Sequence, residues 1–185
     1  MSDASDSVSI SLPEVRFAGA STKTAHGRIE TPERVIETRQ ALIQPSLVAD
    51  LRGFAREAAE RAYAPYSNFR VGAAVVMSDD PEARIFTGSN VENASYGATI
   101  CAERSAIFAA AGAGFRKIGL LFLTTLHSLD GETADRSPCG SCRQVIREFA
   151  DEKTLLFLDG GDDEVLGEVL DIERLLPWGF VLDRS

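Results

Sequence analysis

The three cysteines of this 185-residue chain constrain its fold more than any other feature, because they occur in two short motifs. Cys101 stands alone, whereas Cys139 and Cys142 are separated by one helical turn. Zinc binds thiolates at about 2.3 Å in a tetrahedral arrangement, so neighbouring sulfurs lie roughly 3.8 Å apart, which suits this spacing. A structural zinc site normally has four Cys or His ligands, whereas a catalytic site has three and an open position. The cysteines therefore predict a Zn²⁺ site of the catalytic kind, with Cys101, Cys139 and Cys142 as ligands.

The cysteine pattern also has other interpretations. A lone Cys-x-x-Cys pair fits a dithiol redox pair or two buried cysteines. His127 is able to close the site as a fourth ligand, although a loop histidine without a partner motif is more often solvated. A disulfide between Cys139 and Cys142 would need an oxidising compartment, to which nothing else in the chain points.

Glu103 lies two residues after Cys101, and Pro138 directly precedes Cys139. Cys-x-Glu followed by Pro-Cys-x-x-Cys is a signature of zinc deaminases, in which the glutamate does not bind the metal but transfers protons beside it. We therefore expect Glu103 to be the catalytic residue.

Three thiolates would give a bound zinc ion a net negative charge, so positive groups nearby are needed to keep its bound water acidic. The sequence predicts helices over about 102–111 and 139–150, which would put the cysteines at two helix N-termini, each with about half a positive charge. Arg104 would add charge compensation on the same turn as Cys101, and Arg143 is a second candidate. Either arginine could instead pair with a surface carboxylate.

The remaining segments alternate between helical and strand-like patterns. Ser46 is the expected N-cap of a helix that stops at Pro65, with an apolar stripe of Leu47, Leu51, Phe54, Ala58 and Ala62. Gly112 is the expected C-cap of the second helix. We further expect a hairpin of strands 69–77 and 84–89, a strand over 118–123, a polar loop over 127–137, strands over 154–158 and 164–169, and a helical turn before Pro177.

Residues 1–44 differ in composition from the rest. They are rich in Ser, Thr and charged residues, and Gly and Pro interrupt any periodicity. We expect an N-terminal extension over 1–44, loosely ordered or packed on the surface, and one domain over 45–185.

Charge and hydropathy exclude several classes of partner. A net charge of −9 disfavours nucleic-acid binding and favours a small uncharged substrate. The chain contains neither an apolar run of about 18 residues nor a secretory signal, so we expect a cytoplasmic protein without membrane contact.

From about residue 45 to 180 the chain resembles the small, homotetrameric cytidine deaminases. The resemblance is carried by residues 64–74, 90–97, 101–104, 137–144 and 175–180. The segment Asn90-Val91-Glu92-Asn93 is more specific for free nucleosides than the zinc motifs. The resemblance implies an α/β fold of three α/β/α layers with a mixed five-stranded sheet, and a homotetramer with sites shared between subunits. It also implies Zn²⁺-dependent hydrolysis of cytidine and deoxycytidine to uridine and deoxyuridine, with release of ammonia, in pyrimidine salvage.

The resemblance also implies roles for individual residues. Asn90 and Glu92 would bind the ribose 3′-hydroxyl, and residues two apart on a strand do share a face. Phe69 would pack on the pyrimidine, and Phe180 would enter from a neighbouring subunit. The remaining substrate-binding candidates are Ala102, Tyr66 and Tyr96. Asn90 could instead be only a turn former, Glu92 a solvated charge, and each phenylalanine part of the core.

The chain departs from the family pattern in three places. The extension over 1–44 has no counterpart in the compact members, Ser89 stands where a cysteine is common, and Trp178-Gly179 is an unusual approach to Phe180. Three alternative functions remain: deamination of a modified cytosine nucleoside of the blasticidin S type, a non-catalytic zinc-stabilised binding protein, and editing of RNA or DNA. Asn90 and Glu92 favour an ordinary ribose over the first, and the acidic charge disfavours the third.

Overall fold

A five-stranded sheet is the centre of the fold. The computed structural model describes residues 6–127, 132–161 and 165–182. The sheet has the order β11-β10-β9-β7-β8, with the strands β7 (Val71–Met77), β8 (Ile85–Ser89), β9 (Ile118–Thr125), β10 (Leu155–Leu158) and β11 (Glu168–Asp171). Strands β9 and β10 are parallel and the other neighbouring pairs are antiparallel, so the predicted mixed sheet and the β7–β8 hairpin are confirmed.

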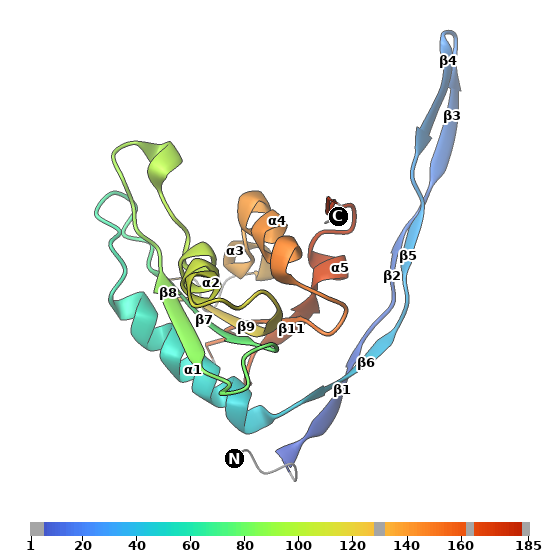
Figure 1. Cartoon of the computed structure of the whole chain (residues 1–185). Coiled ribbons are helices and arrows are strands. Elements are labelled where there is room, and N and C mark those ends of the chain that lie inside the picture. Colours follow the sequence, from blue (N-terminus) through green and yellow to red (C-terminus); the bar gives the residue numbers. More distant parts are fainter. Residues whose placement is uncertain (1–5, 128–131, 162–164, 183–185) are drawn as a thin grey trace.

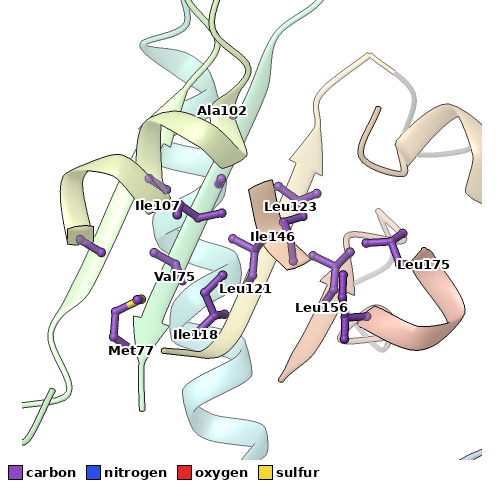
Figure 2. Packing of buried hydrophobic residues seen from close by; sticks show 14 of the residues in the cluster. Val75, Met77, Ala102, Ile107, Ile118, Leu121, Leu123, Ile146, Leu156 and Leu175 are labelled. Atoms are coloured by element: carbon purple, nitrogen blue, oxygen red, sulfur yellow. The ribbon is translucent and has the colours of Figure 1, made fainter. Parts of the chain in front are cut away.

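Helices cover both faces of this sheet (Figure 1). One face packs against α1 (Pro45–Glu60), and the other against α2 (Ala102–Gly112), α4 (Gly140–Phe149) and α5 (Ile172–Leu175). Because successive strand residues point to opposite faces, Ala74 and Val76 face α1 while Val75 and Met77 face α2. In Figure 2, Ile107 of α2 and Ile146 of α4 lie over strand residues such as Val75, Leu121 and Leu156 on this second face. The predicted α/β/α layers are confirmed.

Two glycines let helices approach the sheet closely. A Cβ atom on Gly72 would lie 2.0 Å from the Ala55 carbonyl oxygen of α1. A Cβ atom on Gly88 would lie 2.3 Å from the Ala106 nitrogen of α2. Any side chain at Gly88 would therefore push α2 away from the sheet, together with Cys101 and Glu103 at the start of this helix.

Helix α1 differs in detail from its prediction. Its N-cap is Gln44 and Pro45 is in the first turn, so Ser46 as N-cap is wrong. The Ser46 N–H donates instead to the Asp6 carboxylate at 3.0 Å, so a residue distant in sequence satisfies this free donor. Leu51 and Ala58 are buried as expected, but Phe54 is 45% exposed because the buried face turns toward Ala55.

The extension contains regular structure that its composition did not indicate. Its strands are β1 (Val8–Leu12), β2 (Val15–Phe17), β3 (Ala20–Thr24), β4 (Gly27–Thr31), β5 (Arg34–Ile36) and β6 (Arg39–Ile43). They pair antiparallel as β1–β6, β2–β5 and β3–β4 into one long ribbon that projects from the domain (Figure 1). We call residues 8–43 the N-terminal ribbon. Leu12 and Ile43 anchor its base in the core under α1, whereas β3 and β4 are largely exposed on both faces, which removes the apolar alternation that predicts strands.

Smaller differences concern loops and ends. Helix α2 ends at Gly112 with Ala113 as the C-cap. The strand expected over 164–169 is shifted to Glu168–Asp171, and residue 164 lies outside the described residues. The polar loop expected over 127–137 contains a short helix α3 (Thr133–Arg136), while residues 128–131 lie outside the described residues. None of the helices in the described part of the chain is long and apolar enough to cross a membrane.

Candidate active site

The three cysteine thiols meet between two helix N-termini. Cys101 is the N-cap of α2, Cys139 is the N-cap of α4, and Cys142 lies in the first turn of α4. Their Sγ atoms all lie within 4.8 Å of one another, and no cysteine forms a disulfide. Helices α2 and α4 come together because both pack on the same face of the sheet. The fold thus brings together the cysteines of both sequence motifs.

These thiols are a suitable donor set for zinc. Thiolates are preferred zinc ligands, and three protein ligands are typical of a catalytic centre. Among the described residues, His127 does not join the group: it is exposed, and its Nδ1 accepts a hydrogen bond from the Arg70 N–H at 3.4 Å. Closure of the site by His127 therefore finds no support in the fold.

Arg104 lies against the cysteine cluster. Its Nη2 donates to Cys101 Sγ at 3.5 Å and to the Thr99 carbonyl at 3.0 Å. A hydrogen bond from Cys142 and the nearby Arg104 guanidinium lower the pKa of the Cys101 thiol to about 5, and the same hydrogen bond raises the pKa of Cys142. The cluster thus favours a thiolate at Cys101.

Arg143 has a different place from the one expected. Its guanidinium donates to the Pro138 carbonyl at 2.8 Å, to the Leu175 carbonyl at 3.2 Å and to Ser137 Oγ at 3.0 Å. The fold therefore uses Arg143 to hold the loop that leads into Cys139, and the contacts of Arg143 within the described residues include neither a sulfur nor a carboxylate.

Glu103 occupies the first turn of α2 and is 5% exposed. Burial raises the pKa of its carboxyl group to about 7. A carboxyl with a pKa near neutrality can both accept and donate a proton, which suits an acid–base residue.

The side chain of Asn90 is bound to the start of β7. Its Nδ2 donates to the Phe69 carbonyl at 2.8 Å, and its Oδ1 accepts from the Val71 N–H at 2.9 Å. An amide has two donor hydrogens and two acceptor lone pairs, so Asn90 keeps one of each for a ligand. The two hydrogen bonds with Phe69 and Val71 hold the Asn90 amide in one orientation.

Glu92 is held by the loop before β7. Its Oε2 accepts from the backbone N–H groups of Tyr66 at 2.8 Å and Ser67 at 3.2 Å, and its Oε1 accepts from the Ser67 hydroxyl. The hydrogen bond from Ser67, followed by that from Tyr66, holds the pKa of Glu92 below its usual value. Glu92 is thus an oriented carboxylate rather than a freely solvated charge.

One cavity of about 410 Å³ connects most of these groups. Its lining includes Phe69, Asn90, Glu92, Cys101, Glu103 and Cys139. Tyr66 and Tyr96 line an adjoining hollow of about 340 Å³, which shares Ser67, Glu92 and Thr99 with the first.

Two further predicted residues do not line these hollows. Ala102 is fully buried in the first turn of α2. Phe180 lies outside the lining of both hollows; it is 66% exposed, and Gln144 Nε2 donates to its carbonyl at 2.9 Å.

Comparison with known proteins identifies the family. A model described as the cytidine and deoxycytidylate deaminase zinc-binding region matches residues 49–158. The chain belongs to this family. A cytidine deaminase of Mycoplasma genitalium is 38% identical over 121 residues, which cover 65% of this chain and 85% of that protein. One of Mycobacterium tuberculosis is 43% identical over 106 residues, covering 57% of this chain and 74% of that protein.

Solved structures of the family agree with the fold. The crystal structure of cytidine deaminase from Burkholderia pseudomallei aligns with a TM-score of 0.59 and 40% identity, over 71% of this chain and 97% of that one. The corresponding values for the Mycobacterium tuberculosis structure are 0.57, 38%, 72% and 96%. The predictions of a deaminase family member, of a hydrolytic deaminase and of the α/β/α fold are confirmed.

Sequence patterns did not point to three residues at this deaminase site. Ser67 binds Glu92, and Arg136 joins the cavity wall to the sheet by donating to the Asp159 carbonyl at 2.7 Å and to Glu168 at 2.7 Å. Thr125 also lines the cavity, from the end of β9. A single serine, arginine or threonine in a polar loop or at a strand end carries no motif, and only the tertiary contacts reveal its place.

Proposed function

We propose that this protein is a zinc-dependent cytidine deaminase that converts cytidine and deoxycytidine to uridine and deoxyuridine and releases ammonia. Membership of the family supports this proposal. The observation that carries it is the 410 Å³ cavity, because its lining combines Cys101 and Cys139 of the cysteine cluster and buried Glu103 with Asn90 and Glu92. A cavity of this size is suited to a small ligand with several polar groups.

The proposed metal site consists of Cys101, Cys139 and Cys142, whose sulfurs lie within 4.8 Å of one another. When bound there, Zn²⁺ supplies Lewis acidity and a hydrolytic nucleophile at neutral pH. Arg104 and the two helix N-termini would offset the negative charge of the thiolates.

Glu103 would carry the protons of the reaction. Its carboxylate is assigned to take a proton from the attacking water and pass it to N3 of the cytosine ring, while the remaining hydroxide adds to C4. Glu103 would then carry the proton of the new C4 hydroxyl to the departing amino group, so that the C4 carbonyl forms and ammonia leaves. Burial supports this role, because a carboxyl shielded from bulk water exchanges protons with the bound ligand. Ala102, in the same turn, would offer its free backbone N–H to the base.

The sugar and the base would be held by groups with fixed orientations. Asn90 and Glu92 would bind the ribose 3′-hydroxyl, supported by the hydrogen bonds that fix both side chains. Phe69 would pack on the pyrimidine ring from the cavity wall. Tyr66 and Tyr96, at the adjoining hollow, would lie on the sugar side.

We further propose a homotetramer in which Phe180 of the partner subunit covers the cavity. Support comes from the exposure of Phe180 at one part of the surface and of Tyr66 and Tyr96 at the rim of the cavity. Exposed aromatic groups of this kind are typical of protein interfaces. The reaction is assigned to pyrimidine salvage in the cytoplasm, where thiols remain reduced.

An ultraviolet assay of cytidine and deoxycytidine, with and without a chelator, tests the proposed reaction. We expect loss of cytidine absorbance, formation of uridine and ammonia, and inhibition by chelator that added Zn²⁺ reverses. An oligonucleotide containing cytosine serves as the control and should not react. Zinc-loaded protein that leaves both nucleosides unchanged would refute the proposal, and sedimentation analysis tests the tetramer separately.

A further inference from the structure

The last described segment of the chain, residues 171–182, is held from two sides. We call it the C-terminal segment. On one side is α4, which begins at the cysteine cluster: Arg143 donates to the Leu175 carbonyl at 3.2 Å, and Gln144 donates to the Phe180 carbonyl at 2.9 Å. These contacts link the helix that carries Cys142 to the segment that carries Phe180.

On the other side is the base of the N-terminal ribbon. Arg174 donates to the carbonyls of Leu12, Pro13 and Glu37, at distances of 2.5–3.1 Å, and so contacts both ribbon edges. Arg34 of β5 forms an ion pair with Glu173. Charged side chains that bind several carbonyls fix the direction in which the ribbon leaves the domain.

An aromatic pair extends this contact beyond α5. The ring of Phe17 on β2 meets the ring of Trp178 edge to face, with 4.8 Å between centroids and an interplanar angle of 64°. Trp178 is two residues before Phe180, and residues 177–182 have no helix or strand of their own. The ribbon is therefore the neighbour that restrains the aromatic part of the C-terminal segment on the side opposite α4.

We propose that the N-terminal ribbon positions the C-terminal segment through the Phe17–Trp178 contact and thereby presents Phe180 for the partner subunit's active site. This inference rests on the proposed function. A segment without regular structure loses conformational entropy when it binds, and holding it in one conformation beforehand reduces that cost. Phe17 is thus a positioning residue that acts through Trp178, and it does not touch substrate.

Trp178 makes the contact directly observable, because it is the single tryptophan of the chain. In Phe17→Ala we expect its fluorescence to shift to the red and its anisotropy to fall. We expect KM for cytidine to rise about fivefold, the factor that corresponds to one aromatic contact, with zinc content and kcat nearly unchanged. The control is Ile29→Ala, which removes an apolar side chain that is 62% exposed on the outer strand β4 and should leave both readouts as in the wild type.

A double-mutant cycle separates positioning from general stability. In the Phe180→Ala background, Phe17→Ala should raise KM no further, because the group that it positions is already gone. Phe17→Leu keeps apolar bulk and provides a folded variant if Phe17→Ala does not fold, with a smaller change in the same direction.

Three results would overturn the inference. Unchanged Trp178 fluorescence would show that the contact does not form, and a shifted fluorescence with unchanged KM would show that the contact does not reach the active site. Equal effects of Phe17→Ala with and without Phe180 would show that the ribbon acts elsewhere. Wild-type protein without turnover would instead refute the proposed function, and this coupling with it.

Discussion

Arg104 Nη2 lies 3.5 Å from Cys101 Sγ and donates a hydrogen bond to it, while the same nitrogen binds the Thr99 carbonyl at 3.0 Å. The carbonyl fixes the guanidinium, so its charge stays beside the sulfur. This pair connects Cys101, a proposed metal ligand, to Thr99 in the wall of the proposed nucleoside cavity.

Arg104→Ala should weaken zinc binding by about 10–100-fold, because the positive charge and hydrogen bond beside one thiolate are lost. Turnover should fall in parallel. Metal content after dialysis against a graded chelator series measures the effect. Arg61→Ala removes an exposed arginine that forms an ion pair with Glu57 across one helical turn, and it is the matched control. Zinc retention equal to that of the control would disprove charge compensation by Arg104.

Glu103→Gln should lower kcat by about 10²–10⁴-fold, since an amide cannot transfer the protons that the carboxyl transfers. Zinc content and cytidine binding should persist, because glutamine has nearly the same shape. Metal analysis and calorimetric titration with cytidine check these two expectations, with the exposed Glu57→Gln as control. Appreciable residual turnover would assign proton transfer to another group.

Glu92→Ala should raise KM for nucleosides roughly tenfold or more with little effect on zinc, because it removes the proposed hydroxyl-binding carboxylate and leaves the three cysteines in place. Ser67→Ala should have a smaller effect in the same direction, since Glu92 keeps its two backbone donors. Steady-state kinetics with cytidine measure both. A change in kcat alone would argue against ribose binding by Glu92.

Asp159 should make stability depend on pH. Burial disfavours its charge, but hydrogen bonds from Arg56, Gly161 and Thr124 prevail and lower its pKa below 3.8. A lowered native pKa gives stability that is present above the unfolded value of 3.8 and is lost as pH falls through the native pKa.

Urea unfolding of the wild type should therefore show a falling free energy of unfolding below about pH 5. Asp159→Asn should cost about 3–5 kcal/mol at pH 7, because it removes the buried carboxylate that forms ion pairs with Arg52 and Arg56 of α1. In the variant, the free energy of unfolding should also fall less steeply below about pH 5. If the free energy of unfolding depends on pH in the same way in both proteins below about pH 5, the titrating group is not Asp159.

Two adjacent threonines on β9 should respond in opposite ways to the same substitution. The buried Thr125 hydroxyl has no hydrogen-bond partner among the described residues, whereas Thr124 Oγ1 donates to Asp159 at 2.9 Å. Thr125→Val should raise the free energy of unfolding by about 1 kcal/mol, and Thr124→Val should lower it by about 1–3 kcal/mol. Chemical denaturation at neutral pH measures both; destabilisation by Thr125→Val would reveal a partner for its hydroxyl.

Several parts of the fold follow from local sequence signals. The apolar run before Ser78 and the run over 118–123 became β7 and β9, because short apolar segments rich in branched residues pack well inside a sheet. Other boundaries depended on distant partners. Asp6 binds the start of α1, and β11 begins at Glu168, which pairs with Leu158 of β10. The N-terminal ribbon had no local signal, because its outer strands bury neither face.

The sequence by itself determined the family and the reaction class, because its cysteines and Glu103 have the spacing typical of zinc deaminases and the family model matches residues 49–158. Only the tertiary structure decided which neighbours surround those atoms. It placed Arg143 on the Leu175 carbonyl, bound Glu92 to Ser67, and joined Phe17 to Trp178. Such contacts join residues far apart in the chain through side chains without a motif, and they form only when the helices and strands pack.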